Sequence, residues 1–143
     1  MIEKDLFEFT SLEQLKGLDA MFGFQFENLV LGNLQMLFPM LGLESSLVLS
    51  AAPYCQRATA DRDGCQIDLL IQTQRMLMAV EIKRRREIGH EIIDEVSEKV
   101  RKLKFSGNLS LRTALVYDGR LSPSVAADRY FDFLLPFDRL LCE

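Results

Sequence analysis

Two acidic residues and a lysine stand inside segments that otherwise read as buried strands. The stretch "GCQIDLLIQTQRMLMAVEIKRRR" holds Asp68 in one apolar run, and Glu81 and Lys83 in the next. Because side chains alternate faces along a strand, Glu81 and Lys83 point to the same side, about 6.6 Å apart along the strand. A turn over residues 73–76 places Asp68 directly opposite Glu81, with Cβ atoms about 5 Å apart. The spacing therefore predicts two facing carboxylates with an ammonium group beside them.

This arrangement is suited to holding a divalent cation. Two like charges across a strand pair repel, and their burial is costly unless a positive charge lies between them. Mg²⁺ is commonly held by one or two carboxylates, waters and phosphate oxygens, and the backbone carbonyl of Ile82 offers one more ligand. Lys83 would stand beside the metal-bound water and stabilise charge that develops on a phosphoryl group. We therefore expect Asp68 and Glu81 to bind Mg²⁺ or Mn²⁺, with attack of a metal-bound water on a phosphoryl group as the chemistry.

Ion pairing is the alternative explanation for the same three residues. A pair between Lys83 and either carboxylate on a half-exposed sheet requires no chemistry, and surface pairs are common. The context weighs against this, because residues 76–80 are apolar on both faces, as are residues 67–71 apart from Asp68. Such runs are typical of strands buried on both sides of a sheet.

The elements that must position these residues follow from periodicity and from chain breakers. The sequence first predicts a helix over residues 22–38 stopped by Pro39 and a strand over 45–54 closed by Pro53. A hairpin of strands over 64–72 and 76–83 follows, in which Gln72 pairs with Leu77 and Leu70 with Ala79. The remaining predicted elements are an amphipathic helix within 88–107, a strand over 111–117, a short helix begun by Ser122 and Pro123, and an edge strand with a last turn in "FDFLLPFDRLL". This α-β-β-β-α-β order predicts an α/β fold, a mixed central β-sheet flanked by helices.

Size and composition fit one domain. The chain has 143 residues, of which 48% are hydrophobic and 27% are charged, so we expect a lead-in segment over 1–20 and a single domain over 21–143. No apolar run approaches the roughly 18 residues of a membrane span, and we expect a cytoplasmic protein.

The three cysteines show no CxxC spacing and are expected to be buried thiols. The net charge of −4 means that any nucleic-acid surface must be local.

The residues of the hairpin resemble a known family. A lone Asp in one strand, about a dozen residues, an E-x-K in the next strand and an amphipathic helix after it are similar to the PD-(D/E)xK nuclease superfamily. Asp68 matches the Asp of that pattern, Glu81 and Lys83 match its E-x-K, and Ile67 stands where the nominal Pro would be. The resemblance implies a restriction-endonuclease-like core and a metal-dependent DNA endonuclease. The family pattern also has an acid on the preceding helix, which Glu27 fits.

Glu27 is also notable on its own. Its helical neighbours three and four residues away are Gly23, Phe24, Val30 and Leu31. A carboxylate among such apolar neighbours is not expected to be solvated, so Glu27 is a fourth candidate catalytic residue. The alternative is a charge at an exposed edge of the helix.

Three segments carry a narrower resemblance. The stretches "FGFQFENLVL", "VEIKRRREIG" and "RTALVYDG…YFDFLLPFDRLL" are similar to the C-terminal, nuclease-like domain of prokaryotic AAA-type ATPases. This implies an ATPase domain or subunit as partner. The chain itself contains no GxxxxGK[ST] phosphate loop.

A basic run follows the candidate site. Arg84, Arg85 and Arg86 continue directly from the E-x-K, and such residues commonly contact the phosphate backbone of DNA. A solvated strand face is the alternative. Three functions stay open: a nuclease, an inactive nuclease-fold module that serves an ATPase in nucleic-acid binding or assembly, and an unrelated α/β interaction domain. Monomer and homodimer also both stay open.

Overall fold

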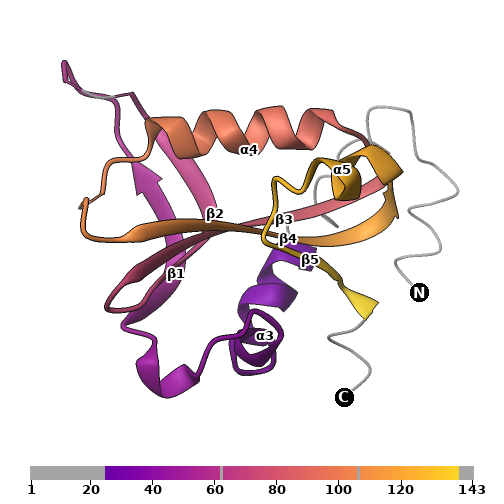
Figure 1. Cartoon of the computed structure of the whole chain (residues 1–143), viewed down its shortest axis with the longest axis horizontal. Coiled ribbons are helices and arrows are strands. Elements are labelled where there is room, and N and C mark those ends of the chain that lie inside the picture. Colours follow the sequence, from indigo (N-terminus) through magenta and orange to yellow (C-terminus); the bar gives the residue numbers. More distant parts are fainter. Residues whose placement is uncertain (1–24, 62, 106, 139–143) are drawn as a thin grey trace, which may run out of the picture.

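The computed structural model describes residues 25–138 except 62 and 106. Among these residues, five strands form one mixed sheet in the order β1-β2-β3-β4-β5. Helix α4 covers one face, and α3 with the helical residues 25–31 lies on the other (Figure 1). The elements are α3 (Leu34–Met40), the 3₁₀ turn η1 (Ser45–Leu47), β1 (Ser50–Gln56), β2 (Cys65–Gln72), β3 (Met76–Ile88), α4 (Glu91–Lys102), β4 (Ser110–Leu121), α5 (Pro123–Asp128) and β5 (Phe133–Pro136).

The predicted α/β class with a mixed sheet is confirmed, and so is the register of the hairpin. Strands β1 to β3 are antiparallel, whereas β3, β4 and β5 run parallel, with α4 as the crossover between β3 and β4. Gln72 pairs with Leu77 and Leu70 with Ala79, as the sequence predicts. Register matters here because a slip of one residue would move every side chain of a strand to the opposite face.

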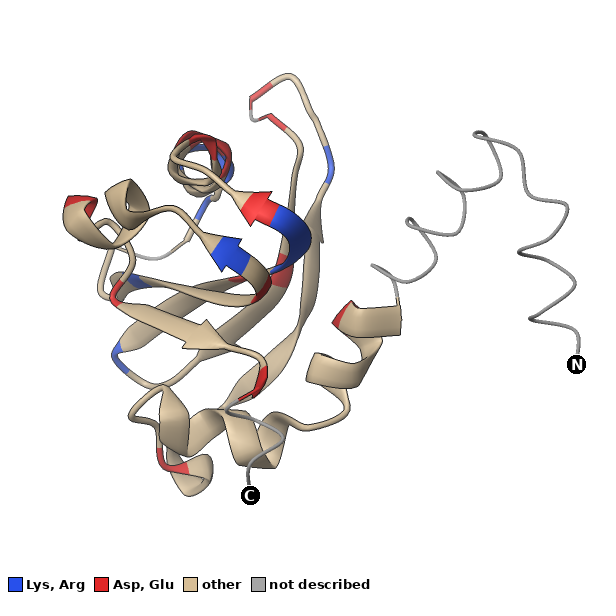
Figure 2. Cartoon of the chain, turned by 90° about the vertical axis from the view of Figure 1, so that its right-hand side faces the viewer, with Lys and Arg blue, Asp and Glu red and all other residues tan. Residues whose placement is uncertain are grey.

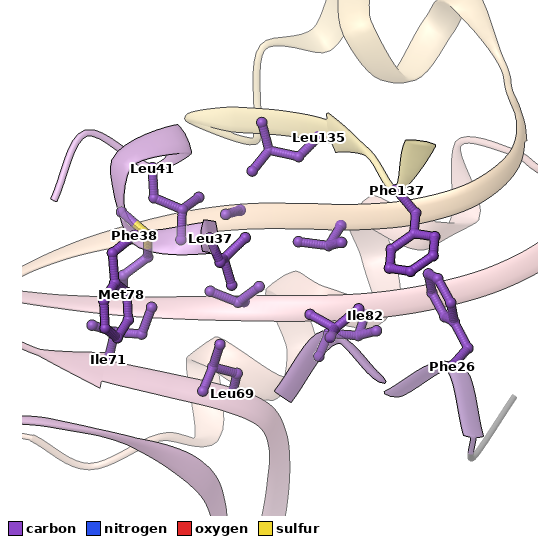
Figure 3. Close-up of a cluster of buried hydrophobic side chains, with 14 residues drawn as sticks. Phe26, Leu37, Phe38, Leu41, Leu69, Ile71, Met78, Ile82, Leu135 and Phe137 are labelled. Atoms are coloured by element: carbon purple, nitrogen blue, oxygen red, sulfur yellow. The ribbon is translucent and has the colours of Figure 1, made fainter. Parts of the chain in front are cut away.

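Apolar side chains form a layer on each face of the sheet. On the α3 side, Phe26 meets Phe137 edge to face, with ring centroids 4.7 Å apart (Figure 3). On the α4 side, Ile92, Ile93 and Val96 are buried against the sheet. Burial of one such aliphatic side chain stabilises the fold by about 1.5–3 kcal/mol. The two layers therefore clamp β3 from both sides, and its residues 77–82 are all buried.

The first helix differs from the prediction. The sequence predicts one helix over residues 22–38, but helical residues end at 31 and α3 begins after a break at Gly32 and Asn33. Glycine has a low helix propensity, which favours a break at Gly32. The Asn33 side chain donates a hydrogen bond to the carbonyl of Leu29 at 2.6 Å, and so provides a partner for a carbonyl near the C-terminal end of the first helical segment. Pro39 lies inside the last turn of α3 instead of stopping the helix before it.

Two further expectations on β1 are wrong. The strand does not close at Pro53 but continues to Gln56, because β1 is an edge strand of the described sheet and a proline there interrupts few ladder hydrogen bonds. Cys55, on the same edge strand, is exposed and Cys65 is only half-buried. The expectation of buried thiols therefore fails for Cys55, and Cys142 lies outside the described residues.

Strands β3 and β4 are longer than predicted, and the end of the chain follows the expected order. Their parallel pairing continues beyond Lys83 and Tyr117 as far as Ile88 and Leu121. α5 has a proline in its first turn, and β5 is the predicted terminal edge strand. The predicted lead-in over residues 1–20 lies outside the described residues. None of the helices described is long and apolar enough to cross a membrane.

A buried glutamine joins β1 to the end of α4. Gln56 is 3% exposed. Its Nε2 donates to the carbonyls of Lys102 and Asp63, both at 2.7 Å, and its Oε1 accepts from the backbone N–H of Lys104 at 3.1 Å. Since the last carbonyls of a helix have no partner within the helix, this side chain satisfies one of them.

We expect Gln56→Leu to lower the free energy of unfolding by about 1–3 kcal/mol, because it leaves buried backbone groups without partners. Urea unfolding followed by circular dichroism measures the change. Gln66→Leu is the matched control, since Gln66 is exposed on the neighbouring strand. Equal effects of the two substitutions would contradict the assigned role of Gln56.

Candidate active site

The sheet splits where the charged residues begin. The last paired residues of β2 and β3 are Leu69 and Val80. On its other edge β2 stays paired with β1, but the register shifts around Pro53, so that Asp68 and Leu69 both lie opposite this proline. Two residues opposite one make a β-bulge, which bends a strand and redirects its side chains. Beyond the bulge, β1 and β2 diverge together from β3 and rise toward the end of α4 (Figure 1).

Asp68 points into this split. Its Oδ2 accepts a hydrogen bond from the backbone N–H of Ile82 at 2.9 Å, so the carboxylate takes the place of the ladder partner that β2 no longer supplies. In a strand, the N–H and C=O of one residue face the same neighbour. The carbonyl of Ile82 is therefore directed toward the same split, next to the carboxylate of Asp68.

Glu81 lies beside Asp68 and is almost completely buried, with 3% exposure. Its two carboxylate oxygens accept hydrogen bonds from Nζ of Lys99, on α4, at 3.0 and 3.2 Å. Nζ of Lys83 lies 3.5 Å from Oε2 of Glu81. The structure thus brings Asp68, Glu81 and Lys83 together and adds Lys99, which the sequence analysis did not select.

A second acid of α4 extends the network. Glu95 lies 3.7 Å from Nζ of Lys83 and 3.2 Å from Nη2 of Arg85. Glu95 and Lys99 are four residues apart, so they project from the same face of the helix. A signal for Lys99 was present in the sequence, because it stands seven residues after Ile92 and three after Val96, on the apolar stripe of α4. A lysine within that stripe indicates a buried partner.

The electrostatics of the pair follow from burial. Burial raises the pKa of Glu81, and repulsion from Asp68 raises it further, against the opposing influence of Lys99 and Lys83. A hydrogen bond between the carboxyl groups of Glu81 and Asp68 adds to the rise. For Lys99, burial lowers the pKa, but attraction by Glu81 outweighs it, and the net pKa is raised. Lys99 therefore keeps its proton at neutral pH and lies beside a carboxyl group, that of Glu81, whose pKa is raised.

Glu27 approaches Asp68 from the other side. It is half-buried on the helical residues 25–31. Glu27 and Asp68 line one hollow of about 230 Å³, whose other lining residues come from β1 and β2. Glu81 and Lys83 do not line this hollow. The structure thus brings Glu27 to the hollow that Asp68 lines.

The basic run is largely paired. Arg84 Nε lies 3.2 Å from Asp118 on β4, and Arg85 is held by Glu95 on α4. Arg86 is exposed. In Figure 2 the basic segment of β3 runs beside the end of β4 and ends next to an acidic residue. Two of the three arginines in the predicted DNA-binding strip thus neutralise acids of the protein itself, and Arg86 is the one best placed to meet a phosphate.

The donor set fits a hard cation in kind. Asp68, Glu81 and the carbonyl of Ile82 offer oxygen ligands, as Mg²⁺ prefers. Across the described residues, however, no group of three or more His, Cys, Asp or Glu side chains converges as a metal cluster. A metal at the split would need water or phosphate oxygens to complete its coordination. It would also require Lys99 to release oxygens of Glu81.

The raised pKa of Glu81 predicts a pH dependence of stability. A folded-state pKa above the ordinary value of 4.5 means that the folded chain binds more protons than the unfolded chain between these two values. We therefore expect wild type to become more stable relative to Glu81→Gln as the pH falls from neutral toward 4.5. Urea unfolding of both proteins across this range measures the difference.

Glu98→Gln is the control for that measurement. Glu98 is exposed, and its pKa is lowered mainly by the hydrogen bond with Arg101. Wild type should therefore gain no stability relative to Glu98→Gln over this range, because a lowered pKa affects stability only below about pH 4.5. A pH-independent difference between wild type and Glu81→Gln would contradict the electrostatics described for the pair.

Comparison with protein-family models finds no match for this chain. Searches of curated proteins and of solved structures likewise find no significant match. Inference about function therefore depends on the geometry of Asp68, Glu81, Lys83 and Lys99 at the split in the sheet.

Proposed function

We propose that this chain is a Mg²⁺- or Mn²⁺-dependent DNA endonuclease domain with a restriction-endonuclease-like core. The observation that carries the proposal is the carboxylate of Glu81, 3% exposed, placed beside Asp68 where two strands separate. Burial of a carboxylate next to another carboxylate is costly. Perturbed acids at such a place are typical of functional sites. The resemblance of the sequence to PD-(D/E)xK nucleases supports the same assignment.

Each residue has a role in this proposal. Asp68, Glu81 and the carbonyl of Ile82 would hold the metal, which when bound acts as a Lewis acid and lowers the pKa of water. Lys83 orients the attacking water and stabilises negative charge on the phosphoryl group. Glu27, across the hollow from Asp68, orients water or the metal's remaining ligands.

The proposed partner is DNA, and the proposed setting is a cytoplasmic AAA-type ATPase. With a net charge of −4, DNA binding must depend on local cations. Arg86 supplies one of these, because it is exposed and follows the site directly on β3. The association with an ATPase is based on the resemblance of three sequence segments alone.

One observation favours a second candidate function. Lys99 and Lys83 already neutralise Glu81, so the site is electrically satisfied without a metal. Buried ion pairs of this kind can be purely structural. The second candidate is therefore a nuclease-fold module without catalytic activity, which serves an ATPase in nucleic-acid binding or assembly.

We expect the purified protein to cleave DNA with Mg²⁺ or Mn²⁺ but not with Ca²⁺ or a chelator, because Ca²⁺ has looser geometry and is a poorer Lewis acid. Each of Asp68→Asn, Glu81→Gln and Lys83→Ala should reduce the rate by at least about a hundredfold. Glu98→Gln, an exposed carboxyl-to-amide change on α4, is the control and should leave it unchanged. Cleavage of a plasmid, followed on gels, measures these rates.

Two results would overturn the proposal. Cleavage at the wild-type rate by Asp68→Asn and Lys83→Ala would indicate a contaminating nuclease. Absence of both cleavage and metal binding in folded wild-type protein would favour the second candidate.

DNA binding can be tested separately from cleavage. We expect Arg86→Ala to weaken DNA binding and to reduce the slope of log affinity against log salt by about one. Arg85→Ala is the matched control and should have a smaller effect, because Arg85 is already paired with Glu95. Fluorescence anisotropy with Ca²⁺ at several salt concentrations measures both. Equal slopes for wild type and Arg86→Ala would contradict the role of Arg86.

A further inference from the structure

Lys99 contacts the same oxygens that a metal would need. Its Nζ lies 3.0 Å from Oε1 and 3.2 Å from Oε2 of Glu81, so one ammonium group covers both oxygens of the carboxylate. Lys83 is more distant from Glu81, at 3.5 Å, and is shared with Glu95. Lys99 is thus the principal cation bound to Glu81.

An ammonium group and a divalent cation cannot both keep these positions. A Mg²⁺ ligand atom lies at about 2.1 Å from the metal, so a metal on Glu81 would stand within a few ångströms of the Lys99 nitrogen. Repulsion between the two cations in a buried setting is strong. Lys99 has a flexible four-carbon stem and its side chain is 32% exposed, so it is free to withdraw toward solvent.

The net charge of the site also opposes metal binding while Lys99 stays in place. When both carboxyl groups are ionised, as metal binding requires, Asp68 and Glu81 carry two negative charges, which the two positive charges of Lys83 and Lys99 balance. A divalent cation would therefore enter a site that is already neutral, and its binding includes the cost of separating Lys99 from Glu81. Without Lys99, the same carboxylates would present uncompensated negative charge to the metal.

We propose that Lys99 is a built-in competitor of the divalent cation for Glu81, which sets the metal concentration at which the site fills. This inference rests on the proposed function, because it concerns the same metal. Lys99 is a positioning residue in this role: it acts on Glu81 and is displaced when the metal binds. At low metal concentration the site then stays empty, and Lys99 compensates the two carboxylates that would otherwise repel each other.

The test is the affinity for Mn²⁺ in the absence of DNA, measured by electron paramagnetic resonance of the free ion. We expect Lys99→Met to bind Mn²⁺ about tenfold more tightly than wild type, since no ion pair has to be broken. Lys99→Arg keeps the charge and should stay close to wild type. Lys102→Met, on the same helix but paired with the exposed Glu98 at 4.0 Å, is the control and should not change the affinity.

A second measurement uses the wild-type protein and does not depend on the folding of a variant. In nuclear magnetic resonance spectra of the lysine side chains, addition of Mg²⁺ should shift the Lys99 ammonium signal and leave that of Lys102 in place. Wild type that binds Mn²⁺ with an affinity unchanged in Lys99→Met, or a Lys99 signal unmoved by bound Mg²⁺, would overturn this inference alone. Failure of wild type and Lys99→Met alike to bind Mn²⁺ would overturn the proposed function together with it.

Discussion

The hydrogen bond from the N–H of Ile82 to the carboxylate of Asp68 determines the geometry of the whole site. β2 leaves β3 at this point, and a separating strand exposes backbone groups that must find other partners. Asp68 supplies that partner from the departing strand itself. The split can therefore exist inside a sheet whose neighbouring residues 77–82 are buried, and it opens next to the carboxyl groups of Asp68 and Glu81.

The second constraint is the charge of Glu81. A carboxylate with 3% exposure needs compensation, and α4 provides it through Lys99. On the same helix, Glu95 pairs with Lys83 and Arg85 of β3, so these charged side chains of the sheet meet opposite charges on the helix. α4 is therefore both the apolar cover of this face and the source of its counter-charges, and its position is fixed at one end by Gln56. This coupling ties the chemistry of the site to the packing of the fold.

Much of the fold was predictable because it depends on local patterns. Two apolar runs separated by a short polar turn predicted the hairpin and its register as far as Leu70 with Ala79, and an apolar stripe with a basic last turn predicted α4. The break at Gly32 was not predicted, because a short apolar period continues across it. The passage of β1 through Pro53 was not predicted either, since it depends on β1 being at the edge of the sheet and on the bulge opposite Asp68.

The sequence by itself determined the register of the hairpin, which brings Asp68 close to Glu81, and placed Lys83 on the same side of β3 as Glu81, because strand period and turn length fix these relations. Only the tertiary structure decided that Lys99 covers Glu81, that Glu27 shares a hollow with Asp68, and that Arg84 and Arg85 are paired with acids of the chain. These contacts join residues on elements that the chain brings together by packing. Local periodicity specifies which face of each element is apolar, but not which polar side chain at its margin meets which partner.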